Sequence, residues 1–142
     1  MENQIADSHS AGPASSITNL AAPQATGTSF MLQLYNNGVS IGYVGVNSSN
    51  WCVLVTDISQ AIKFSQYIYS GVNYYMANGS YLSISNNAYA GLYGWSGACG
   101  WIFEANGTFL CQYNSQHLSL YSNDNAYLYA WDAYTALTVK QV

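Results

Sequence analysis

The chain is 142 residues long and carries two basic residues, both lysines, against six acidic ones, for a formal net charge of −4. This balance argues against binding of nucleic acid or anionic lipid, because both need several Lys or Arg side chains to neutralise phosphates. Disorder does not explain the low charge, since 50% of the residues are hydrophobic and 15% aromatic. The length suits one domain with a sizeable core.

The first 28 residues differ in composition from the rest. They are rich in Ala, Ser and Thr, contain both prolines and show no apolar alternation, so we expect a flexible N-terminal tail followed by one domain over 29–142. A basic segment followed by an apolar one is missing, which predicts no signal peptide. No stretch approaches the roughly 18 apolar residues of a membrane span. We therefore expect a protein that is cytoplasmic or released without a signal peptide.

From residue 30 onward, short alternating stretches are separated by turn residues. The stretches 30–35 and 39–46 are joined by Asn36-Asn37-Gly38, a hairpin signal, because Asn and Gly accept positive φ. Residues 57–60 are expected to form a turn or one helical turn. The other expected strands are 51–56, 61–64, 67–69, 74–76, 81–85, 91–95, 101–103, 108–113, 117–121, 127–131 and 137–139. Strands this short and closely spaced predict an all-β sandwich or barrel.

One part of the sequence is repeated. Residues 81–95 return 36 residues later, without a gap, as 117–131. The identical pairs are Leu82/Leu118, Ser83/Ser119, Asn87/Asn123, Ala90/Ala126, Leu92/Leu128, Tyr93/Tyr129 and Trp95/Trp131. A fainter copy covers 43–64. The spacing predicts three repeats of about 38 residues, each with four short strands.

Three units of four short strands resemble the β-trefoil, in which six strands close a barrel and three hairpins cap one end around a pseudo-threefold axis. The resemblance covers residues 29–142 and rests on repeat length, strand count and the recurring pattern of 81–95. Closure explains the repeat, since one unit cannot bury its apolar face alone and a closed barrel has no exposed edges. The expected core residues are Leu32, Val46, Val53, Phe64, Leu82, Ile84, Leu92, Phe103, Leu110, Leu118, Leu120, Leu128 and Val139.

Few residues suit catalysis. His117 is the one histidine beyond the tail, and it stands where Tyr81 stands in the preceding unit, so we interpret it as a repeat variant rather than a general base. Asp124 and Asp132 flank a strand, as a paired-carboxylate glycosidase would require, but the second unit has neither carboxylate. No second histidine provides metal-ligand spacing. We expect a protein that is not an enzyme and holds neither cofactor nor metal.

The three cysteines, Cys52, Cys99 and Cys111, do not form a disulfide pattern. Their number is odd, their positions do not match between repeats and none lies in a Cys-x-x-Cys motif. We expect three free thiols that behave as small buried apolar groups, which favours a reducing compartment.

Many β-trefoils are lectins with up to three shallow sites, one per repeat, so the resemblance implies carbohydrate binding. Such sites combine an acidic or amide side chain, which bonds to sugar hydroxyls, with an aromatic ring that stacks on the apolar sugar face. We therefore expect neutral glycans or glycoproteins as partners. The predicted binding residues are Asp57, Asn87, Trp95, Asn123, Asp124, Asn125, Trp131 and Asp132. An alternative remains open, in which the two tryptophans pack the fold and the aspartates cap turns.

The chain departs from the ricin-type lectins, whose Gln-x-Trp motif is absent near the end of each repeat. In composition and length it is more similar to β-trefoil agglutinins of mushrooms and bacteria that lack a signal peptide. Two other classes of function stay open. One is a protein-binding β-trefoil, such as a protease inhibitor or companion subunit, and the other is a self-assembling structural or toxin-associated protein. The low charge also favours a homo-oligomer.

Overall fold

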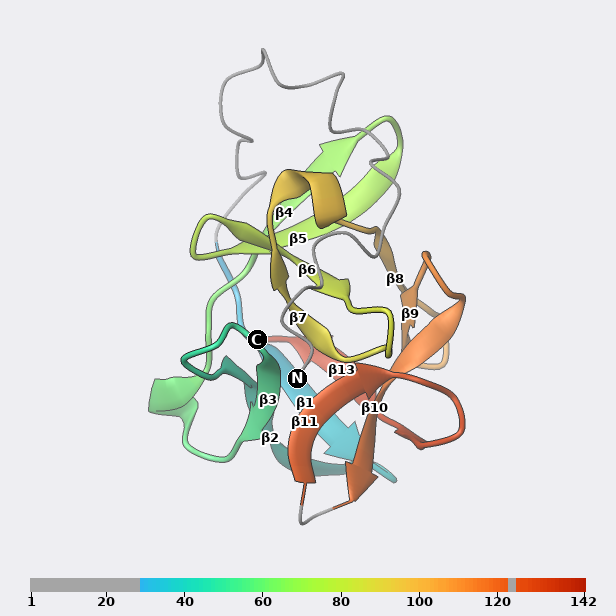
Figure 1. Ribbon diagram of the computed structural model, residues 1–142. Helices are drawn as coiled ribbons and strands as arrows, with labels where there is room; N and C mark the ends of the chain where they lie inside the picture. Colours follow the sequence, from blue (N-terminus) through green and yellow to red (C-terminus); the bar gives the residue numbers. More distant parts are fainter. Residues whose placement is uncertain (1–28, 123–124) are drawn as a thin grey trace.

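The computed structural model describes residues 29–122 and 125–142, which form an all-β structure, as predicted (Figure 1). The expected tail, 1–28, lies outside the described residues. The strands are β1 (Leu32–Asn36), β2 (Val39–Val46), β3 (Cys52–Val55), β4 (Ser65–Tyr69), β5 (Val72–Ala77), β6 (Ser80–Ile84), β7 (Ala90–Tyr93), β8 (Trp101–Phe103), β9 (Phe109–Cys111), β10 (Gln116–Ser122), β11 (Asn125–Ala130), β12 (Thr135–Ala136) and β13 (Thr138–Gln141). Helical structure in the described part consists of two 3-10 turns, η2 (Ile58–Gln60) and η3 (Trp95–Gly97).

Three hairpins close through two-residue turns in which both residues have positive φ. These residues are Asn37 (54°) and Gly38 (80°), Ser70 (51°) and Gly71 (79°), and Asn78 (53°) and Gly79 (78°). Paired positive φ values match the right-handed twist of the flanking strands, which is why Asn-Gly and similar pairs are favoured there. The hairpin turn predicted at 36–38 is confirmed.

The prediction of a strand at 61–64 is wrong. The 3-10 turn η2 ends at Gln60, and the next strand, β4, begins only at Ser65. Of this segment, Phe64 forms a single bridge with Phe30. β7 ends at Tyr93, two residues earlier than expected, because the chain turns into η3 at Trp95.

The strands form two antiparallel sheets. The larger has the order β13-β1-β2-β3-β11-β10-β9-β8, with β12 against β10, and the smaller has the order β4-β5-β6-β7. The ends of the larger sheet approach each other, since Thr108 forms a bridge with Thr138 and the N–H of Val139 donates to the carbonyl of Gly107 at 2.9 Å. The result is a nearly closed, barrel-like sheet (Figure 1).

The hairpins β2–β3, β6–β7 and β10–β11 meet through their second strands. Single residue pairs join β3 to β7, β7 to β11 and β11 to β3: Trp51 with Gly91, Tyr89 with Tyr129, and Tyr127 with Val53. In each pair, one member belongs to the set 51, 89 and 127, and the other to the set 53, 91 and 129. The three strands are therefore related by a constant spacing of 38 residues.

The first strands of the second and third hairpins, β6 and β10, are related by 36 residues, as in the sequence repeat. Leu82 of β6 pairs with Leu92, whereas Leu118 of β10 pairs with Ala130. The chain between the paired residues Leu120 and Leu128 is thus two residues longer than the chain between the paired residues Ile84 and Ala90. Side chains alternate between the faces of a strand, so a shift by two residues leaves the apolar face unchanged.

The main hydrophobic core fills the space between the sheets and contains most of the expected residues. Those that are buried, at 5% exposure or less, are Leu32, Phe64, Leu82, Ile84, Leu92, Leu118, Leu120, Leu128 and Val139. Val46 and Phe103 are partly buried against them. The predictions for Val53 and Leu110 are wrong, because their neighbours Cys52, Phe109 and Cys111 take the inward positions of the same strands.

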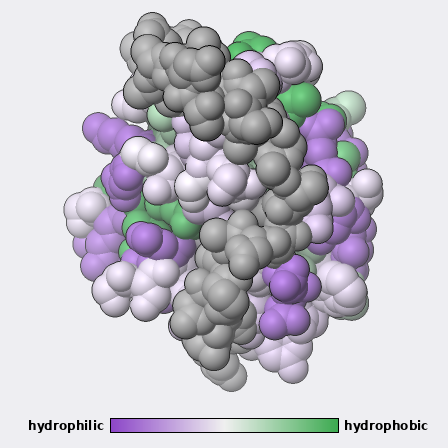
Figure 2. Space-filling view, turned by 45° about the horizontal axis from the view of Figure 1, so that its top comes forward, coloured by the Kyte–Doolittle hydropathy of each residue, from purple (hydrophilic) through white to green (hydrophobic). Residues whose placement is uncertain are grey.

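The surface matches the composition. On the face that Figure 2 shows, the described residues are mostly hydrophilic or near neutral, and hydrophobic ones are confined to small areas. Exposed large apolar side chains, such as Val39, Ile58 and Ile68, lie on different elements.

Candidate functional site

A hollow of about 310 Å³ lies between the β6–β7 loop and the β11–β12 turn. Among the described residues it is lined by Asn86, Asn87, Trp131 and Tyr134. The two asparagines come from the loop between β6 and β7, and the two aromatic residues from the turn between β11 and β12. Two amide side chains therefore share one hollow with two aromatic rings.

The asparagine loop is shaped by Ser85, which is buried. Its hydroxyl oxygen accepts the N–H groups of Asn87 at 3.1 Å and Tyr89 at 3.2 Å, and its carbonyl accepts the N–H of Ala88 at 2.9 Å. The side chain of Ser85 thus satisfies backbone donors that would otherwise lack partners. Asn86 and Asn87 are exposed at the tip of this loop.

The first repeat unit forms the same loop with different residues. The side-chain oxygen of Asn47 accepts the N–H groups of Ser49 at 2.9 Å and Trp51 at 3.1 Å, and its carbonyl accepts the N–H of Asn50 at 3.0 Å. Asn50 and Ala88 have nearly equal positive φ values, 69° and 68°. The loop geometry is thus repeated, but its tip carries two serines in the first unit and two asparagines in the second.

The aromatic side of the hollow is supported by tilted and edge-to-face contacts between tyrosine rings. Tyr134 lies with its ring centroid 4.9 Å from those of both Tyr121 and Tyr129. Tyr129 in turn lies 4.6 Å from Tyr89, at the end of the asparagine loop. Trp131 keeps 43% of its surface exposed, so its ring remains available to a ligand.

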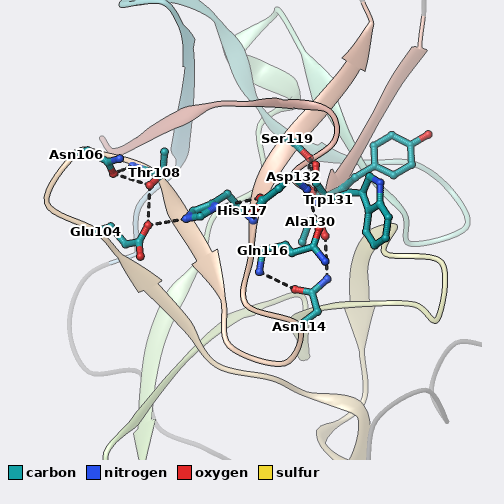
Figure 3. A network of polar contacts seen from close by, with 11 residues as sticks. Glu104, Asn106, Thr108, Asn114, Gln116, His117, Ser119, Ala130, Trp131 and Asp132 are labelled. Atoms are coloured by element: carbon teal, nitrogen blue, oxygen red, sulfur yellow. Dashed lines mark hydrogen bonds and ion pairs between the residues drawn. The ribbon is translucent and has the colours of Figure 1, made fainter.

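The backbone of Trp131 is held by Ser119, a fully buried residue of β10 (Figure 3). The hydroxyl group of Ser119 donates to the carbonyl oxygens of Trp131 at 3.0 Å and Tyr129 at 3.3 Å, and it accepts the N–H of Trp131 at 3.2 Å. The N–H of Tyr134 donates to the carbonyl of Trp131 at 3.0 Å and closes the turn. These bonds fix the two aromatic residues relative to β10.

Asp132 is hydrogen-bonded to β10 through both its backbone N–H and its carboxylate. Its N–H donates to the side-chain oxygen of Gln116 at 2.8 Å, and one carboxylate oxygen accepts the N–H of His117 at 2.8 Å and its ring Nδ1 at 3.0 Å. Asn114 adds a further tie, since its side-chain amide donates to the carbonyl of Ala130 at 2.9 Å. Asp132 therefore anchors the turn that carries Trp131.

His117 lies between two carboxylates. Its Nε2 is 2.7 Å from Glu104 and its Nδ1 is 3.0 Å from Asp132 (Figure 3). Ionised carboxylates only accept hydrogen bonds, so two such partners favour the imidazolium form, in which both ring nitrogens donate. Burial lowers the pKa of His117, but the hydrogen bonds to Asp132 and Glu104 raise it above its usual value.

The pKa of Glu104 is shifted in the opposite direction, below its usual value. Hydrogen bonds from Thr108 and then from His117 lower the pKa of its carboxyl group. Both ring nitrogens of His117 are thus occupied by carboxylates, which leaves no imidazole nitrogen free to act as a general base.

The structure brings together two of the predicted site residues, Asn87 and Trp131. Asp132 is adjacent, but its carboxylate faces His117. Asn123 and Asp124 lie outside the described residues, and Asn125 begins β11.

The other two predicted residues lie in other parts of the fold. Trp95 packs into a second aromatic cluster, with ring contacts to Tyr67 at 5.5 Å, Tyr69 at 5.8 Å, Tyr74 at 4.8 Å and Tyr81 at 5.0 Å. Asp57 is exposed and caps η2, where its side chain accepts the N–H of Ser59 at 3.0 Å. That hydrogen bond lowers the pKa of Asp57.

The sequence prediction missed Tyr134. It follows Trp131 by three residues across a tight turn, so the signal was local. The segment Trp131–Tyr134 contains a small residue, Ala133, and an aspartate, which favour a turn that brings two rings together.

Comparisons with known proteins do not assign the chain to a family: no family model matches it, and no curated protein matches it either. Within residues 29–122 and 125–142, no cluster of three His, Cys, Asp or Glu residues could hold a metal ion. A search of the same residues for a helix that is long and apolar enough to cross a bilayer finds none.

Proposed function

We propose that this protein is a non-enzymatic lectin of the β-trefoil type, which binds a neutral sugar in the hollow beside Trp131. The observation that carries the proposal is the lining of this hollow: two exposed amides face two aromatic rings. A ring stacks on the apolar C–H face of a sugar, and amides both donate to and accept from its hydroxyl groups.

The size and charge of the hollow support a small neutral ligand. About 310 Å³ is at the lower end of the range of ligand pockets, which begins at about 300 Å³. Its described lining residues are all uncharged, and the carboxylate of Asp132, which follows Trp131 in the chain, is bonded to His117. A terminal monosaccharide of a glycan fits these conditions.

The trefoil part of the proposal is supported by the strand pairing. β3, β7 and β11 pair with one another at a constant spacing, and the loops before β3 and β7 have the same hydrogen bonds. The absence of a free imidazole nitrogen at His117 supports a binding role rather than catalysis.

The test is a glycan array with the intact protein, followed by affinity measurements with the best glycan. Trp131→Ala should weaken binding at least about tenfold, because the stacking surface is lost. Tyr113→Ala is the matched control, since Tyr113 is similarly exposed, at 49%, but does not line the hollow. No retained glycan would contradict a lectin function, and equal affinity of both variants would contradict this site.

A further inference from the structure

The structure places two of the three cysteines side by side in the core. The Sγ atoms of Cys99 and Cys111 are 3.4 Å apart, and both residues are buried. Cys99 precedes β8 and Cys111 ends β9, so the pair joins the two last strands at one end of the larger sheet. Cys52 is also fully buried, but it lies in β3, and burial raises the pKa of its thiol to about 12.

The two sulfur atoms have complementary surroundings. Burial raises the pKa of the Cys111 thiol, but hydrogen bonds from Cys99 and from the backbone of Tyr113 and Asn114 lower it below its usual value. Burial, the hydrogen bond with Cys111 and the negative charge on Cys111 raise the pKa of Cys99. Cys111 is thus the sulfur that carries negative charge more readily, and the thiolate is the nucleophile in thiol–disulfide exchange.

The backbone holds the pair in place. The N–H of Gln112 donates to the carbonyl of Gly100 at 2.9 Å, directly beside both cysteines. A Cβ atom on Gly100 would overlap Val72 and Gln112, so only glycine fits between β5 and β9 here. The segment that contains Cys99 therefore packs closely against the end of β9. It can move away only if the hydrogen bond between Gly100 and Gln112 is lost.

We propose that Cys99 and Cys111 form an intramolecular disulfide when the protein meets a disulfide oxidant such as oxidised glutathione. When the edge strand β8 opens locally and exposes the pair, the Cys111 thiolate attacks one sulfur of the oxidant, which gives a mixed disulfide and releases one glutathione thiolate. The Cys99 sulfur, on losing its proton, attacks the Cys111 sulfur and releases the second glutathione. Two electrons pass to the oxidant, and the two protons lost by the cysteines end on the two glutathione thiols.

The bond would act on the end of the sheet. β8 has one neighbour in the sheet order, β9, and pairs with it through three residues. A cross-link between Cys99 and Cys111 ties the chain just before β8 to the end of β9, which restricts the unfolded chain and secures this edge. The protein would therefore be more stable in an oxidising environment than in a reducing one.

The experiment equilibrates the full-length protein in glutathione redox buffers, from the reduced and the oxidised side, in native buffer and in urea. The protein is then alkylated under denaturing conditions and mapped by mass spectrometry. In the native, oxidised sample we expect alkylation of Cys52 alone and one peptide pair cross-linked through Cys99 and Cys111. The equilibrium constant for the bond should be at least about tenfold larger in native buffer than in urea, because the fold holds the sulfurs together.

Two variants test which cysteines form the cross-link. Cys52→Ser should keep the cross-link and leave no cysteine to alkylate, whereas Cys111→Ser should lose the cross-link. Three alkylated cysteines in native protein, at a redox ratio that oxidises the protein in urea, would overturn the proposal. A cross-link through Cys52, or an equilibrium constant no larger in native buffer than in urea, would also overturn it.

Discussion

Replacement of Ser119 by alanine removes the hydroxyl that holds the Trp131 backbone. The N–H of Trp131 then loses its acceptor, and the carbonyls of Trp131 and Tyr129 each lose one donor; the Trp131 carbonyl keeps the N–H of Tyr134. A buried polar group left without a partner costs about 1–3 kcal/mol. Because the Trp131 turn can relax toward solvent, we expect a loss of about 2 kcal/mol in the free energy of unfolding. This corresponds to a fall of about 8 °C in the thermal midpoint of a domain of this size.

The same substitution should weaken glycan binding, because the ring of Trp131 is no longer fixed at the hollow. Ser83→Ala is the matched control: Ser83 holds the corresponding position in β6 and is also fully buried, but its hydroxyl bonds to Cys99. Calorimetry should show a lower midpoint for both variants, and binding measurements should show a loss for Ser119→Ala alone. Equal losses of affinity, or an unchanged midpoint for Ser119→Ala, would refute the reasoning.

Two further predictions follow from packing and charge. Trp95→Ala should lower the free energy of unfolding by about 3–4 kcal/mol in urea titrations, because Trp95 fills the tyrosine cluster; a loss below about 1 kcal/mol would contradict that role. The pKa of His117 is raised by folding, so its contribution to stability is complete below its unfolded pKa of about 6.5 and is lost as the pH rises through its higher folded pKa. The pKa of Glu104 is lowered, so its contribution is lost as the pH falls below about 4. Thermal midpoints should therefore be highest between about pH 5 and 6.5. His117→Gln should remove the decline on the alkaline side, and an identical decline in both proteins would show that His117 is not its cause.

Local signals in the sequence predicted much of the fold. The Asn-Gly and Ser-Gly pairs set the hairpins because few other residues accept two successive positive φ values. Alternation located the strands, but it could not decide which face of β9 is inward, since Phe109, Leu110 and Cys111 are all apolar. The gapless repeat also hid the two extra residues of the β10–β11 hairpin, because a shift by two preserves alternation.

Only part of the site could be predicted, because residues at equivalent positions of the sequence repeat have different surroundings in the structure. Trp95 and Trp131 are equivalent in sequence, yet one is enclosed by four tyrosines and the other is 43% exposed. Which of the two packs and which faces solvent depends on distant strands that bring Tyr67 and Tyr69 over Trp95. The ties of Asp132 to Gln116 and His117 likewise arise from strand pairing and have no signature in the sequence.

The most direct test of the proposed lectin site follows the four tryptophan indole N–H signals by NMR while the best glycan from the array is added. We expect the signal of Trp131 to shift with saturation, together with the side-chain amide signals of Asn86 and Asn87. Trp51 and Trp101 are buried, at 3% and 0% exposure, and should stay unchanged. Saturable shifts that leave Trp131 and both asparagines unmoved would contradict binding in this hollow.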